Sequence, residues 1–308
     1  MGKSKAQEVA CSAPLLDNMN TIAESIKIER LKENPIKNEI FYIKDCESTL
    51  EIKQFGKKPE CRILNLTKDY CINIRTGEVK EKRKRENRSQ NYESIRRTMN
   101  NLRDLINCNV TDNNKCLWIT LTYDQDNGIV RDTKKVYKDH KNFWERCCTY
   151  FKNHNITIPK YINVLEPQRS GAWHMHLIWI FDQIAPFIPN EEMANLWGHG
   201  FTKTQKLNDS DNIANYVCAY LCDYVYTDKN SNKKMIIKNA RLYLYPNGVR
   251  YYRHSRNLKT PVKTTINSKK EYEDLTKDLL KTYESNVNIY ILNELVQSVH
   301  KEQFKKNK

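Results

Sequence analysis

Glycine is scarce in this chain, and motifs built on glycine or on paired cysteines are missing. Only 8 of the 308 residues are glycine, and no G-x-x-x-x-G-K-[ST] segment occurs, which argues against a fused P-loop helicase. The 10 cysteines are scattered without a C-x-x-C pair, so we expect reduced, mostly buried thiols. No run of about 18 apolar residues is present, which argues against a membrane-spanning helix.

The charge balance is strongly positive. Lys and Arg number 52 against 37 Asp and Glu, a formal net charge of +15, which makes nucleic acid the leading partner and an anionic membrane surface the second. The amino-terminal stretch MGKSKAQEVA has no apolar core of a secretion signal, so we expect an intracellular, cytoplasmic protein. Cys218 and Cys222 are spaced to share a helix face and could hold zinc, although small packed side chains are the preferred interpretation.

The length suggests one catalytic-sized domain with additions at both ends. We assign residues 1–90 to an amino-terminal extension, 91–260 to the main domain and 261–308 to a helical carboxyl-terminal extension. The first 40 or so residues suggest a loose arm ending in a short helix, and the alternation over 60–79 suggests two or three short strands. The basic stretch VKEKRKRENR at 79–88 is either a phosphate-contacting strip or a solvated linker.

The middle of the chain alternates between two hydrophobic periods. Apolar residues at spacings of three and four predict helices, and runs rich in β-branched and aromatic residues predict strands. The resulting order βαββαβα, with mostly antiparallel neighbours, indicates an α+β fold with a central antiparallel sheet of about five strands and flanking helices. The expected helices cover 91–106, 132–153, 190–197 and 209–226, and the expected strands cover 116–123, 161–167, 173–181 and 200–207. A hairpin over 240–255 and a long charged helix over 269–305 complete the prediction.

Two histidines interrupt the apolar stretch GAWHMHLIWIF at 171–181. Because strand side chains alternate, His174 and His176 share one face of the expected strand. A three-residue hairpin loop ending in Gly171 would place Glu166 opposite His174 on that face. Two neutral imidazoles and a carboxylate suit a divalent cation such as Mn²⁺ or Mg²⁺, with positions left open for substrate oxygens. The alternative is a pair of histidines that are simply packed or hydrogen-bonded at a sheet surface.

A second candidate element is the expected helix around Tyr216. Tyr216, Tyr220 and Tyr224 fall at i, i+4 and i+8 and so share one stripe. Aromatic stripes are usually core, but a positioned phenol beside a metal-polarised phosphate can also act as a nucleophile.

These blocks occur in the order that characterises a known family. Through CLWITLTYD, LEPQRSGAWHMHLIW and IANYVCAYLCDY, the chain resembles the HUH endonucleases, specifically the rolling-circle replication initiators of plasmids and phages. The resemblance covers about residues 92–256 and implies a ferredoxin-like or RRM-like sheet. It implies that His174, His176 and Glu166 bind the metal and that Tyr216 and Tyr220 are catalytic.

The resemblance also implies the activity and its partners. Such proteins nick single-stranded origin DNA, form a 5′-phosphotyrosine link, release a 3′-OH and later rejoin strands, working with a host helicase and polymerase. Tyr123 and Trp173 are candidates for stacking on bases, although core packing is the preferred fate of both. One departure is that Ala219 and Asp223 stand where the family usually has lysine, three residues after each tyrosine.

Three other functions stay open. The lost lysines leave room for a non-catalytic DNA-binding relative that keeps the fold and the charge. A transposase or relaxase would use the same chemistry on another substrate. A metal-dependent hydrolase without a covalent step would cleave with both tyrosines replaced.

Overall fold

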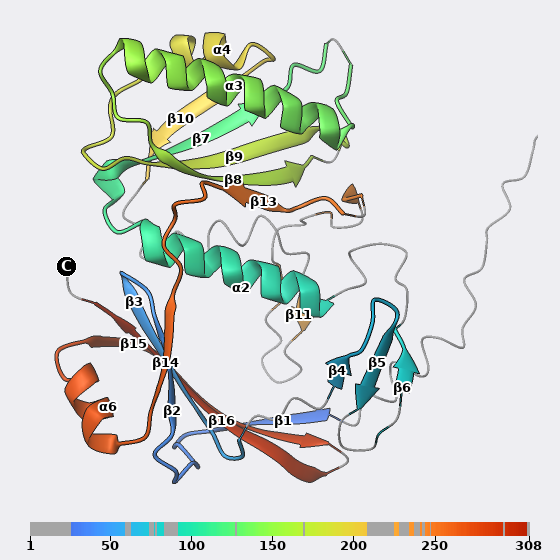
Figure 1. Cartoon of the computed structure of the whole chain (residues 1–308), viewed down its shortest axis with the longest axis vertical. Helices are drawn as coiled ribbons and strands as arrows, with labels where there is room; N and C mark the ends of the chain where they lie inside the picture. Colours follow the sequence, from blue (N-terminus) through green and yellow to red (C-terminus); the bar gives the residue numbers. More distant parts are fainter. Residues whose placement is uncertain are drawn as a thin grey trace, which may run out of the picture. The chain divides into compact units, whose positions relative to one another are not determined.

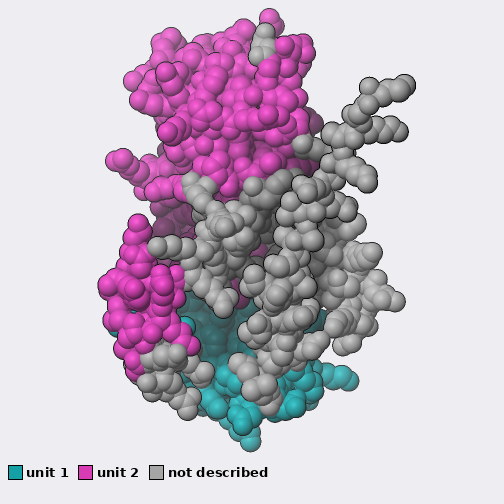
Figure 2. Space-filling model, turned by 90° about the vertical axis from the view of Figure 1, so that its right-hand side faces the viewer, with its two compact units in different colours: residues 1–45, 50–64, 263–307 teal, residues 46–49, 65–262, 308 magenta. Residues whose placement is uncertain are grey.

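The chain divides into two compact units, coloured separately in Figure 2. Unit 1 comprises residues 1–45, 50–64 and 263–307, and unit 2 comprises residues 46–49, 65–262 and 308. The residues described by this computed structural model are 26–58, 63–73, 77, 79–82, 92–126, 128–168, 170–207, 225–227, 234–236, 241, 244–246, 248–291 and 293–306.

Unit 2 contains a five-stranded sheet in which every strand runs antiparallel to its neighbours. The spatial order is β10 (Thr202–Lys206), β7 (Cys116–Thr122), β9 (Trp173–Ile180), β8 (Lys160–Pro167) and β13 (Tyr252–His254) (Figure 1). Paired residues of adjacent strands share a face, so the register decides which side chains meet. The prediction of an α+β fold with a central antiparallel sheet is confirmed.

Helices lie on both sides of this sheet. Figure 1 shows α3 (Thr133–Asn153) and α4 (Asn190–Trp197) on one side and α2 (Tyr92–Asn109) on the other. The side chain of Asp132 begins α3 by accepting a hydrogen bond from the Lys134 amide, which satisfies one of the free N–H groups of the first turn. A 3₁₀ turn, η2 (Asn113–Lys115), precedes β7. The expected order of strands and helices from β7 to β10 is therefore confirmed.

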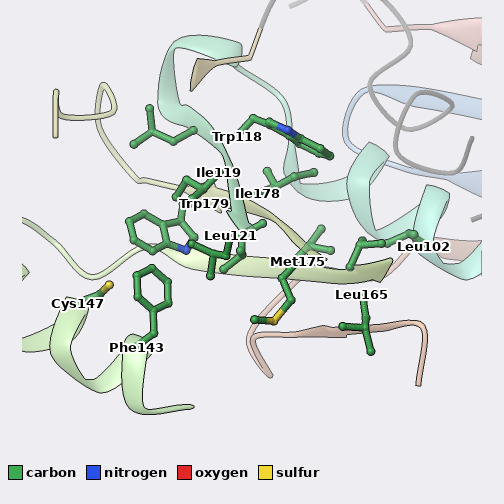
Figure 3. Packing of buried hydrophobic residues seen from close by; sticks show 14 of the residues in the cluster. Leu102, Trp118, Ile119, Leu121, Phe143, Cys147, Leu165, Met175, Ile178 and Trp179 are labelled. Carbon is green, nitrogen blue, oxygen red and sulfur yellow. The ribbon is translucent and has the colours of Figure 1, made fainter. Parts of the chain in front are cut away.

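The core of unit 2 fills both faces of the sheet. On the α3 side, Trp179 is fully buried with its ring centroid 6.0 Å from Phe143 and 5.3 Å from Phe151. Trp118 and Ile178, which face each other in the register, lie on the opposite side of the sheet (Figure 3). Because both faces are covered, the three central strands β7, β9 and β8 are buried along nearly their whole length, and polar side chains within them call for an explanation.

The hairpin predicted over 240–255 is wrong for the residues of that range that the structure describes. Tyr252–His254 forms β13, but it pairs with β8 rather than with a local partner. Tyr245, which would have belonged to the other arm, is buried and donates a hydrogen bond from its hydroxyl to the Leu165 carbonyl at 2.5 Å. Residues 252–254 therefore pair with the edge of β8 instead of forming a local hairpin around the Pro-Asn-Gly turn.

Unit 1 contains a six-stranded sheet in the order β1-β15-β16-β3-β2-β14. The strands are β1 (Ile26–Leu31), β15 (Leu280–Ile291), β16 (Glu294–Lys305), β3 (Thr49–Phe55), β2 (Phe41–Asp45) and β14 (Val262–Ile266). A second core of Phe41, Ile43, Leu50, Ile52 and Phe304 packs on one face. Helix α6 (Lys269–Thr276) covers this core, with Tyr272 stacked on Phe41 at 4.6 Å.

Two helix predictions in the terminal segments are wrong. The helix expected over 269–305 ends at Thr276, and the remainder forms the β15–β16 hairpin. Apolar residues such as Val287 and Ile289 alternate there, and Asn293, with φ of 64°, supplies the left-handed position of the turn. The short helix expected before residue 40 is also wrong for the described residues, because β1 is the element found in 26–40.

Two small sheets complete the described elements. The short strands expected over 60–79 are confirmed as β4 (Ile63–Asn65), β5 (Tyr70–Asn73) and β6 (Val79–Glu81). A strand pair joins β11 (Val225–Thr227) to β12 (Lys234–Ile236), so the helix expected over 209–226 does not extend to its predicted end. No described helix is long and apolar enough to cross a membrane.

Candidate functional site

The β8–β9 hairpin sets the register of the candidate site. The Gln168 amide donates to the Ala172 carbonyl at 2.7 Å, and the Gly171 amide donates back to the Gln168 carbonyl at 3.0 Å. Gly171 has φ of 85°, a conformation that residues other than glycine rarely adopt. The expected three-residue loop ending in Gly171 is confirmed by these bonds, although Arg169 itself lies outside the described residues.

Glu166, His174 and His176 lie on one face of the sheet, as expected. Glu166 is paired with His174 in the register, and the next pair on the same face joins His176 to Val164. The carboxylate reaches diagonally, so that Glu166 Oε2 accepts from His176 Nε2 at 2.7 Å. Thr120 of β7 contacts the other ring nitrogen, His176 Nδ1, at 3.2 Å. We call this side of the sheet the histidine face; it is the side on which α2 lies.

The environment of His174 keeps its imidazole neutral. Burial lowers the pKa of His174 to about 4; the nearby His176 acts in the same direction, and Glu166 opposes the shift. The two imidazole rings are 6.3 Å apart between centroids, and the side-chain amide of Gln168 contacts the His174 ring nitrogens. A neutral imidazole is the form that binds metal ions.

The donor set of the hairpin fits a divalent cation in its chemistry. One carboxylate oxygen and one imidazole nitrogen already face each other, and the neutral imidazole of His174 belongs to the neighbouring residue on the same face. The three donor atoms do not all lie within 4.8 Å of one another, and His174 contacts Gln168. Binding by all three residues therefore requires His174 to exchange the Gln168 amide for the cation.

One described group of three does meet that distance. It consists of Glu284, His300 and Glu302 in unit 1. The ammonium group of Lys281 bonds both carboxylates there, and Tyr272 donates to Glu302 at 2.7 Å. These contacts already neutralise and satisfy the buried acids, as an ion-pair network does.

Two polar residues of the hairpin site were missed by the sequence reasoning. Thr120 fixes one nitrogen of His176, and Gln168 contacts His174 and accepts from Gln125 Nε2 at 2.8 Å. Gln168 stands two residues after Glu166, so strand alternation alone would have placed it on the same face. Thr120 could be placed beside His176 only from the pairing of β7 with β9, which the sequence analysis did not predict.

The histidine face continues to an exposed basic edge. Lys203 of β10 is paired with Thr120, which is itself paired with His176, so the three lie in one row across the sheet. Lys203 is exposed, and Phe201, two residues earlier, is 74% exposed. An exposed aromatic ring beside a lysine is a suitable surface for a base and its phosphate.

Several other candidates cannot be placed beside the hairpin. Tyr216, Tyr220, Ala219 and Asp223 lie outside the described residues, as do Cys218, Cys222 and most of the basic stretch 79–88. The six described cysteines form no disulfide.

The structure also settles the two proposed base-stacking residues in favour of core packing. Tyr123 is 4% exposed and Trp173 is 2% exposed, so neither ring offers a free surface. The Tyr123 hydroxyl donates to Asp139 at 2.9 Å. Burial, together with the Asp139 carboxylate, raises the pKa of Tyr123 far above its ordinary value, so this phenol is not an activated nucleophile.

Comparison with known proteins gives one match. No curated protein and no solved structure matches the chain. Residues 116–224 match the family model of the replication-associated protein ORF2/G2P, a segment of about a third of the chain. The matched segment begins with β7 and includes the histidine hairpin and both candidate tyrosines. Over this segment the protein is therefore similar to replication-associated proteins, which supports a role as a replication initiator.

Proposed function

We propose that this protein initiates rolling-circle replication by nicking single-stranded origin DNA through an HUH-type mechanism. The observation that carries the proposal is the contact between Glu166 and His176, beside His174, on one sheet face within the segment similar to replication-associated proteins. Titratable groups that are buried or half-buried on an otherwise apolar strand pair are characteristic of a functional site. The net charge of +15 supports DNA as the partner.

In this proposal the hairpin supplies the metal ligands and the tyrosines supply the nucleophile. A divalent cation, Mn²⁺ or Mg²⁺, held by His174, His176 and Glu166 would polarise the scissile phosphate. The phenolic oxygen of Tyr220 or Tyr216 attacks the phosphorus, and the bond from phosphorus to the 3′ oxygen breaks. That oxygen leaves with a proton as a free 3′-OH, while the 5′ phosphate stays esterified to tyrosine. Attack by a later 3′-OH reverses the step and rejoins the strand.

Thr120 and Gln168 are positioning residues in this proposal. Thr120 orients the His176 ring through Nδ1, which leaves Nε2 directed at Glu166. Gln168 holds His174 in the absence of a cation, and its link to Gln125 ties the hairpin to the loop after β7.

The decisive experiment is adduct formation with a single-stranded origin oligonucleotide and Mn²⁺. We expect a covalent protein–DNA species by mass spectrometry, abolished by combining Tyr216→Phe with Tyr220→Phe. Tyr224→Phe, on the same expected stripe, is the matched control and should leave the adduct intact. Adduct formation by the double variant would remove the tyrosine assignment.

The hairpin is tested in the same assay. His174→Ala and His176→Ala should each reduce adduct yield by about 10²-fold or more, because each removes a ligand of the cation that stabilises the transition-state charge. His154→Gln, at an exposed histidine after α3, is the control. Full activity of the His176 variant would contradict the proposed site.

A second candidate function is a DNA-binding relative without turnover. Ala219 and Asp223, in place of the lysines usual in the resembling family, favour it. Tight DNA binding with no adduct across several divalent metals would support this alternative. Adducts on transposon-end hairpins but not on plasmid origins would instead indicate a transposase, and cleavage that survives the loss of both tyrosines a metal-dependent hydrolase.

A further inference from the structure

The two faces of the unit 1 sheet differ sharply in burial. Strand β3 alternates between buried and half-exposed residues along its whole length. Its buried positions, Leu50 and Ile52, join the second core, and α6 covers that side. The residues between them point to the other face, where the side chains are half-exposed or exposed. This second face is therefore a partly solvated sheet surface.

Register and ion pairs place a set of cations and aromatic rings on this surface. Lys44 is paired with Glu51, and Tyr42 with Lys53. Lys301 of β16 forms an ion pair with Glu51 at 3.0 Å, which puts it on the same side. Ser285 of β15 is the partner of Lys301, so Tyr283 and Val287, each two residues away, lie on the same side. Arg30 of β1 is paired with Val287 and therefore lies there too. We call the following six residues the cationic face: Arg30, Tyr42, Lys44, Lys53, Tyr283 and Lys301.

The cationic face carries excess positive charge around one central carboxylate. Lys44, Lys53 and Lys301 approach Glu51 at 3.3, 2.8 and 3.0 Å. Glu294 stands at the far tip of the hairpin and is paired with Ile291. One carboxylate cannot neutralise three ammonium groups, so the surface retains a positive potential that suits a polyanion.

The aromatic rings of this surface are available for contact. Tyr283 is 49% exposed, and the Lys301 ammonium lies 5.7 Å from the centroid of its ring. Tyr42 packs edge-on against Phe55 at 5.3 Å and is half-exposed. Alternating cations and aromatic rings on a sheet are the features that bind single-stranded nucleic acid, since bases stack on rings while ammonium groups contact phosphates.

We propose that the cationic face is a second DNA-binding surface, which holds single-stranded DNA and lies outside the segment that matches the replication-associated family. The proposal rests on the proposed function only in its choice of DNA as the partner. It gives the terminal segments of the chain a role in retaining the displaced or origin strand, separate from cleavage.

The test measures binding by the full chain without divalent metal. The probe is a fluorescent oligothymidylate of about 20 nucleotides, followed by anisotropy in EDTA at several salt concentrations. Combining Arg30→Gln with Lys53→Gln should weaken binding about tenfold and reduce the salt dependence, because two phosphate contacts are lost. The matched control combines Lys270→Gln with Lys277→Gln, which removes two exposed charges in or beside α6, on the covered side.

A neutral variant separates binding from folding. Tyr283→Ala removes an exposed ring, so its fold should be retained in circular dichroism, and we expect binding to fall about five-fold with the salt dependence unchanged. Wild-type affinity in both face variants would overturn the proposal. So would a clear preference for duplex DNA, or binding to phosphatidylserine vesicles with no effect of the variants on DNA.

Failure of this inference is distinguishable from failure of the proposed function. At saturating oligonucleotide, the face variants should still form the covalent adduct with Mn²⁺. A wild-type chain that forms no adduct but loses affinity in the face variants would contradict the nicking proposal alone.

Discussion

The two sheets of this protein differ in where their polar residues lie. In unit 2, β7, β8 and β9 are buried along nearly their whole length, and the half-exposed residues Glu166, His174 and Thr120 lie toward one end of one face. In unit 1, β3 alternates strictly, and its charged residues Glu51 and Lys53 lie on the half-exposed face.

The difference shows what a polar side chain means in each setting. A strand covered on both faces has no solvent to receive a charge, so a buried histidine or glutamate needs a partner or a ligand. A strand covered on one face places charges in water at little cost, and such charges indicate a surface rather than a site. The hairpin therefore points to chemistry, and the cationic face points to binding.

The largest expected effect comes from creating a cavity in the core of unit 2, where both faces of the sheet are covered. Trp179→Ala removes a fully buried ring that contacts Phe143 and Phe151, so we expect the free energy of unfolding to fall by about 3–5 kcal/mol. Urea denaturation followed by circular dichroism measures the loss. Trp179→Phe should cost markedly less because it keeps an aromatic ring in the site. A loss below about 1 kcal/mol for the alanine variant would contradict the packing described for this side of the sheet.

The next largest effect is the pH dependence of stability in unit 1, whose sheet is covered on one face. Burial raises the pKa of Glu51, but the hydrogen bond from Lys53 and the charges of Lys44, Lys53 and Lys301 outweigh it and lower that pKa from 4.5 to about 2. A folded pKa below the unfolded value means that the ionised carboxylate stabilises the fold above pH 4.5. That contribution is lost as the pH falls from 4.5 toward about 2.

Glu51→Gln isolates this contribution. We expect it to lower the free energy of unfolding by about 2 kcal/mol at pH 7 and to flatten the decline between pH 4.5 and 2. Denaturation midpoints at pH 7 and pH 3 provide the measurement. Glu33→Gln, at an exposed carboxylate after β1, is the control and should change neither quantity. A pH profile identical to that of the wild type would show that Glu51 is not held by the lysines.

A smaller effect concerns Tyr245, which the sequence analysis placed in the hairpin over 240–255. Tyr245→Phe removes the buried hydroxyl that donates to the Leu165 carbonyl on β8, next to Glu166. We expect a loss of about 1–2 kcal/mol, because the carbonyl is left without this donor. Tyr150→Phe, on the half-exposed side of α3, should cost less than about 0.5 kcal/mol in the same denaturation assay. Equal losses in the two variants would argue against the bond.

Much of unit 2 could be predicted from the sequence because its elements are specified locally. The periodicity of α2 and α3, the apolar runs of β7 and β9 and the short loop at Gly171 each lie within one contiguous stretch. The long hairpin of unit 1 could not be predicted in this way. Residues 280–305 carry charges at helical spacing as well as the alternating apolar residues Val287 and Ile289, and pairing with β1 and β3, more than 200 positions away, favours the strand conformation.

The shared face of the three candidate ligands could be predicted from the sequence, but their contacts could not. Alternation placed Glu166, His174 and His176 on one face, and the loop length fixed the pairing of Glu166 with His174. The diagonal contact from Glu166 to His176 and the hold of Gln168 on His174 depend on side-chain rotamers, which no sequence pattern specifies. Whether the tyrosines reach this site stays a prediction, since Tyr216 and Tyr220 lie outside the described residues.

The smallest expected effect isolates the turn that creates the site. Gly171→Ala introduces a side chain at φ of 85°, where an added Cβ would meet only the flexible Arg131 side chain at 3.3 Å. The cost is therefore backbone strain, which we expect to be about 1 kcal/mol in urea denaturation. Gly171→Asn should cost less, because asparagine tolerates the left-handed region. If the turn sets the register, both variants should lose adduct yield in the order of their strain. Equal stability of the two variants would show instead that contacts along β8 and β9 hold Glu166 opposite His174 without help from the loop.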